Sequence, residues 1–176
     1  GPVLSALLQS NYTDVHILAY TDKKKKSQDN HDIDSYSNTI GAHQLFETWL
    51  TEQLDSQNKD VKVRINPVEL GHLNDTKSIY NAVTSILNKI SSKDIDKEVT
   101  LYLSPGTPVM SFSWAFASMA NPGMNIKVIA SSEPSKPPEK IHLPYELLDS
   151  SGIRHETVKT PNPKFDVIFH PINGRF

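Results

Sequence analysis

The residues with the most distinctive chemistry form a turn near the middle of the chain: Ser104, Pro105, Gly106, Thr107 and Pro108. Gly106 can adopt the positive φ of a sharp turn and lets a ligand approach the backbone closely. Thr107 is placed to cap a following helix, and Pro108 suits the first helical position. The unpaired amides and the positive dipole end of such a helix favour anions. The turn therefore predicts a site for a phosphate or ribose group.

The same residue types are also ordinary turn and capping residues, so a purely structural turn is the alternative interpretation. The position of the turn favours a site. It follows a strongly apolar strand, precedes the most apolar helix of the chain, and lies near mid-chain, where the strand order of an open sheet can reverse.

Strands and helices alternate around this turn. Short apolar runs predict strands at 15–20, 61–65, 99–103, 126–130 and 165–169, while helical spacing predicts helices at 40–54, about 76–90 and 108–120. Such alternation is typical of an α/β, Rossmann-like three-layer fold with a mostly parallel central sheet and helices on both faces. We expect one domain, because 176 residues leave little room for a second catalytic domain.

Several elements carry finer expectations. Pro67 argues against a central strand continuing past it, so 61–65 is expected as an edge strand. The polar stretch 22–39 predicts a long loop, with Asn38 or Thr39 capping the next helix, and the Pro-rich stretch 131–140 predicts another loop. The helix at 108–120 is apolar nearly all round, which predicts deep burial or a dimer interface.

Ligands of open α/β sheets bind beyond the carboxyl ends of the strands, and this rule supplies the other candidate binding residues. Tyr20, Thr21 and Asp22 end the first strand, Asn74 follows the second, and Ser131 follows the strand at 126–130. Asp22 is equally well explained as a turn cap, and Asn74 is better explained as a loop residue.

Composition excludes several classes of function. The formal charge of −2 gives no general attraction to nucleic acid, so no DNA binding is expected. The chain has no cysteine, and its seven histidines show no metal-ligand spacing, so we expect neither a metal nor a cofactor. The motifs GxSxG, Walker A and GxGxxG are absent, and we assign no catalytic residue.

The beginning of the chain divides into two short segments. Residues 1–2, Gly-Pro, are typical of a protease-cleavage scar. Residues 3–12 begin with a short apolar run, which predicts either a linker with a short helix packed on the domain or the end of a truncated transmembrane helix. The ligand-sensing domain is expected at 13–176.

The stretch LYLSPGTPVMSFSWAF at 101–116 resembles the CARF domains (CRISPR-associated Rossmann fold), as does the first strand ending in Tyr20-Thr21-Asp22. CARF domains sense cyclic oligoadenylates made during type III CRISPR immunity. The resemblance spans most of the chain, and it implies that Ser104, Gly106, Thr107 and Pro108 line the ligand groove with Thr21 and Asp22 near its other edge.

The resemblance also implies a homodimer binding a symmetric ring, with cyclic tetra-adenylate as the expected ligand, because each protomer can present the same turns to half of it. Such a sensor controls a linked effector, and here the domain is expected in the cytoplasm, with anchoring to the inner membrane as one arrangement of the full-length protein. Two alternatives remain open: a metal-independent ring nuclease, and the sensor domain of an RNA-repair transcriptional regulator, whose turn is similar.

Overall fold

The computed structural model describes residues 1–22, 32–92, 96–133, 136–143 and 165–169, with side chains described for 1–20, 41–92, 96–133 and 136–143. Helices and strands alternate along it, as the sequence predicts. The helices are α1 (Pro2–Leu8), α2 (Asp32–Asp55), α3 (Thr76–Ser91) and α4 (Pro108–Met119). The strands are β1 (Asp14–Asp22), β2 (Lys62–Leu70), β3 (Glu98–Tyr102), β4 (Ile126–Ala130), β5 (Glu139–Ile141) and β6 (Phe165–Phe169).

These strands form one sheet in the order β2-β1-β6-β3-β4-β5. The first five strands of that order run parallel, and β5 pairs antiparallel with β4 at one edge. The mostly parallel Rossmann-like sheet expected from the sequence is therefore confirmed. All five parallel strands end at the same edge of the sheet, so the turns that follow β2, β3 and β4 lie along that edge.

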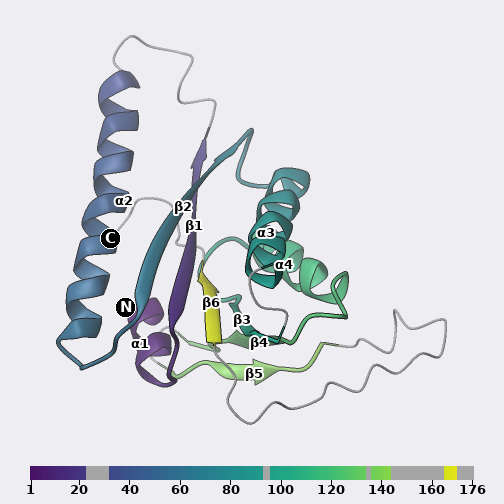
Figure 1. Ribbon diagram of the computed structural model, residues 1–176. Coiled ribbons are helices and arrows are strands. Elements are labelled where there is room, and N and C mark those ends of the chain that lie inside the picture. The colour runs from purple at the N-terminus through teal and green to yellow at the C-terminus, as the bar shows by residue number, and fades with distance from the viewer. Residues whose placement is uncertain (23–31, 93–95, 134–135, 144–164, 170–176) are drawn as a thin grey trace.

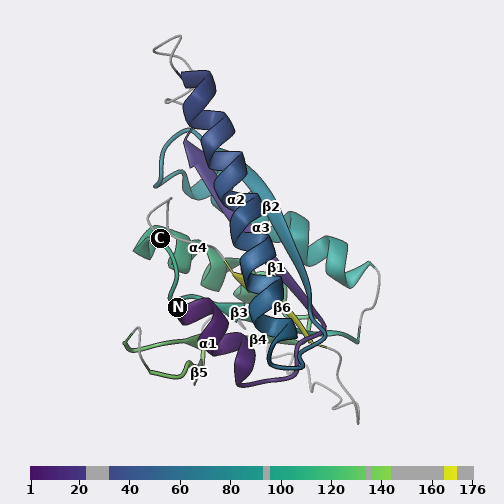
Figure 2. The same ribbon diagram turned by 90° about the vertical axis from the view of Figure 1, so that its left-hand side faces the viewer.

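Helices cover both faces of the sheet, which gives three layers (Figure 1). On one face, α3 and α4 lie side by side, and Leu18, Leu101 and Trp114 belong to the core beneath them. On the other face, α1 and α2 pack over a second core that includes Ile17 and Tyr102 (Figure 2). In α1, Val3, Ala6 and Leu7 are buried in this second core.

The strand order reverses between β1 and β3, and β6 fills the place between them. The chain passes from β1 outward to β2 by way of α2, and from β3 outward to β4 by way of α4, on the opposite face. The carboxyl ends of β1 and β3 therefore flank a topological switch point, the place where open α/β sheets bind ligands.

Two expectations about elements were wrong, and one strand is longer than expected. α2 begins at Asp32, so residues 32–39 are helical and only 23–31 of the expected loop lie outside the described residues. A polar helical turn lacks the apolar periodicity by which helices are detected. β2 is an edge strand, as expected, and it continues through Pro67, because an edge strand pairs on one side only and tolerates a residue without an N–H. Glu139–Ile141 form β5, whose residues are all exposed and so give no alternating pattern.

Within the described parts of the chain, no helix combines the length and apolarity needed to cross a bilayer.

Candidate functional site

The turn between β3 and α4 has the backbone that its sequence predicts. Gly106 has a φ of 116°, a region that residues with a Cβ rarely adopt. Thr107 is extended and caps α4, with its Oγ1 accepting a hydrogen bond from the amide of Met110 at 3.3 Å. Pro108 occupies the first helical position. The predicted roles of these three residues in starting the helix are therefore confirmed.

Two serines join the ends of β3 and β4. The Ser104 hydroxyl donates to the Ser131 carbonyl at 3.1 Å and accepts a hydrogen bond from the Ser131 amide. The Ser131 hydroxyl lies 2.7 Å from the phenol oxygen of Tyr102, whose ring is buried in the core. The structure thus brings Ser104 and Ser131, both predicted as binding residues, into direct contact. Their hydrogen bonds hold the turn after β3 against the turn after β4.

A third hydroxyl supports the turn from inside α4. Ser111 Oγ donates to the carbonyl of Leu103 at 2.6 Å, which ties the first turns of the helix to the end of β3. Neither Ser111 nor Tyr102 was predicted from the sequence, because their partners are set by how the strand end and the helix start meet. A serine in the first turns after a capping residue is the only local signal for Ser111.

The electrostatics of this turn favour an anion. α4 has no acidic residue in its first turn, and no charged residue at all. The amide of Val109 at the second helical position has no partner within the helix, and the positive end of the helix dipole lies beside it. Ser104 and Pro108 are exposed, and Gly106 and Thr107 are half-buried, so a ligand can reach both backbone and hydroxyl groups. Pro105 is buried and shapes the turn from below.

Tyr20 lies in the core below this edge, although it was expected to contact ligand. Its side chain is buried, and its hydroxyl accepts a hydrogen bond from Nε1 of Trp114 on α4 at 3.1 Å. Burial raises the pKa of Tyr20 to about 12, against the lowering effect of the Trp114 hydrogen bond. Thr21 and Asp22 continue β1 in register with Glu69 and Leu70, and only their backbone is described.

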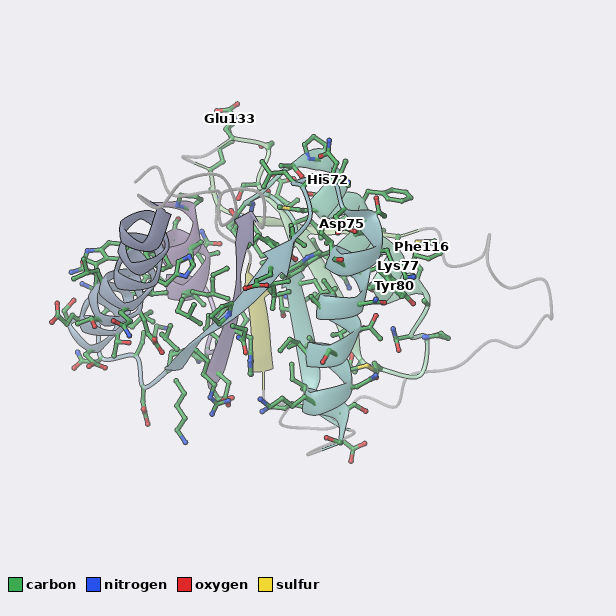
Figure 3. The ribbon with its side chains drawn as sticks, turned by 90° about the horizontal axis from the view of Figure 1, so that it is seen from above. His72, Asp75, Lys77, Tyr80, Phe116 and Glu133 are labelled. Atoms are coloured by element: carbon green, nitrogen blue, oxygen red, sulfur yellow. The ribbon has the colours of Figure 1, made fainter. Side chains whose placement is uncertain are left out.

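Asn74 lies in the loop between β2 and α3, exposed, and its carbonyl accepts a hydrogen bond from the amide of Thr76 at 2.9 Å. β1 and β6 separate β2 from β3, so the structure does not place Asn74 beside the Ser104–Pro108 turn. The next residue, Asp75, caps α3 with its carboxylate. His72 and Asp75 appear near the start of α3 in Figure 3, which views the molecule from above.

Further along the edge, Glu133 and Lys136 form an exposed ion pair at 2.7 Å. The described residues contain no group of three or more histidines and carboxylates that could hold a metal ion. Within the described chain, the chemistry of the site therefore consists of hydroxyls, backbone amides and a helix dipole, which can bind and orient a phosphate or a sugar.

No protein-family model matches the chain, and no curated protein sequence matches it. Solved structures do match. One is Enterococcus italicus Csm6 bound to cyclic hexa-2'-fluoro-hexa-dAMP, which superposes with a TM-score of 0.60 at 14% sequence identity. The match covers 84% of this chain and 39% of the Csm6 chain, so the chain spans well under half the length of this neighbour. At this identity the likeness concerns the fold alone, and it supports the Rossmann-like α/β fold expected from the sequence.

Proposed function

We propose that this chain is a sensor domain that binds a cyclic oligoadenylate at the Ser104–Pro108 turn. The observation that carries the proposal is the start of the uncharged helix α4. Its N-terminal amides and the positive end of its dipole lie beside the hydroxyls of Ser104 and Thr107, at the switch point of a parallel sheet. The Csm6 structure with the same fold holds a cyclic adenylate analogue, which supports this class of ligand.

Each part of the turn has a role in this proposal. The amide of Val109 and the Thr107 hydroxyl contact a phosphate, and Gly106 lets the ligand backbone come close. The Ser104–Ser131 hydrogen bonds hold the ends of β3 and β4 in one arrangement, so that less ordering is needed on binding. Thr21 and Asp22, which end β1 across β6, contact the ring from the other side of the switch point.

The sensor works as a homodimer, in which two copies of the turn face the two halves of one ring. We propose cyclic tetra-adenylate as that ring. Cyclic hexa-adenylate is the alternative, because the neighbour holds a cyclic analogue of six nucleotides. Both rings fit a two-fold arrangement, so direct measurement must decide between them.

Ligand binding then biases a linked effector in type III CRISPR defence, by favouring one of two states of the dimer. The neighbour's chain is much longer than this domain, which is consistent with sensing and effector parts in one protein. An effector anchored in the inner membrane belongs to the same proposal, and its test requires the full-length protein.

The proposal is tested by calorimetric titration of the 176-residue chain with cyclic tetra-adenylate and with cyclic hexa-adenylate, followed by chromatography of the recovered ligand. We expect one intact tetra-adenylate ring bound per dimer. Cleaved ligand would instead identify a ring nuclease. Absence of binding to both rings would overturn the proposal and direct attention to RNA ends, the ligand class of the RNA-repair alternative.

A further inference from the structure

The hydroxyl of Ser104 makes two hydrogen bonds that leave it able only to accept another. Its single hydrogen is donated to the Ser131 carbonyl at 3.1 Å, and the oxygen accepts a hydrogen bond from the Ser131 amide. A serine hydroxyl has one donor hydrogen and two acceptor lone pairs, so one lone pair remains. Because Ser104 is exposed, a ligand can reach this oxygen, and the ligand must then supply the hydrogen.

Thr107, on the same turn, offers the opposite hydrogen-bonding group. Its Oγ1 accepts a hydrogen bond from the Met110 amide at 3.3 Å. Among the residues that the structure describes, no acceptor takes the hydroxyl hydrogen of Thr107. That hydrogen can be donated to a ligand oxygen, as can the amide hydrogen of Val109 at the second helical position. The turn therefore presents two donors beside one acceptor.

The buried core holds the partner of Ser104 in place. The Ser131 hydroxyl lies 2.7 Å from the phenol oxygen of Tyr102, whose ring is buried. If the Ser104 hydroxyl turned its hydrogen toward a ligand, the Ser131 carbonyl would lose its hydrogen bond, and the gain would be offset. Ser104 can accept a hydrogen bond from a ligand without any such loss.

We infer that Ser104 recognises the 2'-hydroxyl of a ribose and makes the turn selective for ribonucleotide rings. The inference rests on the proposed function and adds which group of the ring Ser104 contacts. In a nucleotide whose 3'-oxygen carries the phosphate, the 2'-hydroxyl is a donor on the neighbouring carbon. A phosphate bound by Thr107 and Val109 brings this donor to the same turn, whereas the adenine amine lies at the far end of the base. The 2'-hydroxyl is also the group by which a protein distinguishes RNA from DNA.

The test compares cyclic tetra-adenylate with the same ring carrying fluorine in place of each 2'-hydroxyl. Fluorine at this position keeps a ribose-like sugar shape but has no hydrogen to donate. In calorimetric titrations we expect the unaltered chain to bind the fluorinated ring at least about tenfold more weakly. Csm6 holds a ring of six nucleotides with this substitution, so such a loss would be a property of this chain's own turn.

Two serine variants test whether Ser104 is the acceptor. Ser104→Ala removes the oxygen, and we expect it to bind the two rings with affinities within about twofold of each other. Ser113→Ala is the matched control, because the Ser113 hydroxyl bonds to the Val109 carbonyl within α4, and this variant should keep the full preference. Circular dichroism checks that both variants are folded. If Ser104→Ala does not fold, Ser104→Cys replaces it, since sulfur is a weak acceptor.

The outcomes separate this inference from the proposed function. Equal affinity of the unaltered chain for the two rings would overturn the inference and leave the proposed function standing. An undiminished preference in the folded Ser104 variant would do the same, because another group would then recognise the 2'-hydroxyl. Binding of neither ring by the unaltered chain would overturn the proposed function, and the inference with it.

Discussion

Two strand-to-helix turns lie at the same edge of the sheet, and they differ in the group that caps the following helix. In the turn from β2 to α3, the Asp75 carboxylate accepts hydrogen bonds from the amides of Ser78 at 3.1 Å and Gly71 at 3.4 Å. In the turn from β3 to α4, the neutral Thr107 hydroxyl accepts one from Met110. α3 therefore already holds an anion, its own side chain, whereas α4 does not.

The difference shows why a common motif can bind ligand in one place and not in another. Both turns follow parallel strands, and both present a helix dipole at the edge. At the α3 cap, the Asp75 carboxylate occupies the Ser78 amide and places a negative charge at the positive end of the dipole, which disfavours an incoming phosphate. An uncharged cap keeps the α4 start available.

The largest expected effect comes from making the α4 turn resemble the α3 turn. Thr107→Asp keeps a good helix cap, so the free energy of unfolding should change by no more than about 0.5 kcal/mol. The new carboxylate would repel a ring phosphate, and we expect at least about 100-fold weaker binding of cyclic tetra-adenylate, or nearly 3 kcal/mol. Calorimetry measures the binding, and Thr107→Ser, which keeps the hydroxyl, serves as the control. Unchanged binding in Thr107→Asp would refute the role of this turn.

Helix α4 also has a buried side-chain hydrogen bond in its middle. Nε1 of Trp114 donates this bond to the buried hydroxyl of Tyr20. The pKa of Tyr20 is about 12 in the folded chain, against an ordinary value of 10.0. Between pH 10 and 12 the unfolded chain loses this proton first, so stability should fall as pH rises, by about 2–3 kcal/mol in total. Urea unfolding from pH 9 to 12 measures the loss.

The variant Tyr20→Phe should remove most of this loss of stability, leaving the part due to Tyr12, whose pKa is also raised by burial. An equal loss in the variant would contradict the assignment to Tyr20.

Local features of the site could be predicted from the sequence, and those that depend on distant contacts could not. Gly106, Thr107 and Pro108 determine the turn through their own backbone preferences, and Asp75 determines its cap in the same way. The Ser104–Ser131 contact joins residues 27 positions apart, and the burial of Tyr20 depends on a helix 94 positions away. No local pattern contains either fact.

The fold class followed from the alternation of elements, but the strand order did not. β6 enters between β1 and β3 from the far end of the chain, and this position decides which strand ends flank the switch point. Helix α4 is apolar nearly all round in sequence, which predicted burial or an interface, yet only the structure distinguishes buried Trp114 from exposed Phe112.

A smaller effect is expected from Ser104→Ala, which tests whether the α4 turn needs its connection to β4. Losing the hydroxyl removes both hydrogen bonds to Ser131, and stability should fall by about 1 kcal/mol. We expect ring binding to weaken about tenfold, because the two turns are no longer held together. Ser113→Ala removes a hydroxyl that bonds within α4 to Val109, and it should leave ring binding unchanged. Equal losses of affinity in both variants would mean that general destabilisation, rather than the connection, is responsible.

The smallest effect on binding should come from Asp75→Asn, which neutralises the α3 turn and keeps a capping oxygen. The backbone hydrogen bond from Ser78 lowers the pKa of Asp75, so the cap is stabilising at neutral pH and this contribution is lost as pH falls through the lowered pKa. The protection factor of the Ser78 amide, which corrects the exchange rate for its intrinsic pH dependence, should therefore fall in acid in the unaltered chain and much less in Asp75→Asn. Calorimetry at neutral pH should show ring affinity within about threefold of the unaltered chain, because β1 and β6 separate the two turns and surface charges are screened beyond about 10 Å. A gain of tenfold or more would mean that the ring reaches both turns, and α3 would then belong to the binding site.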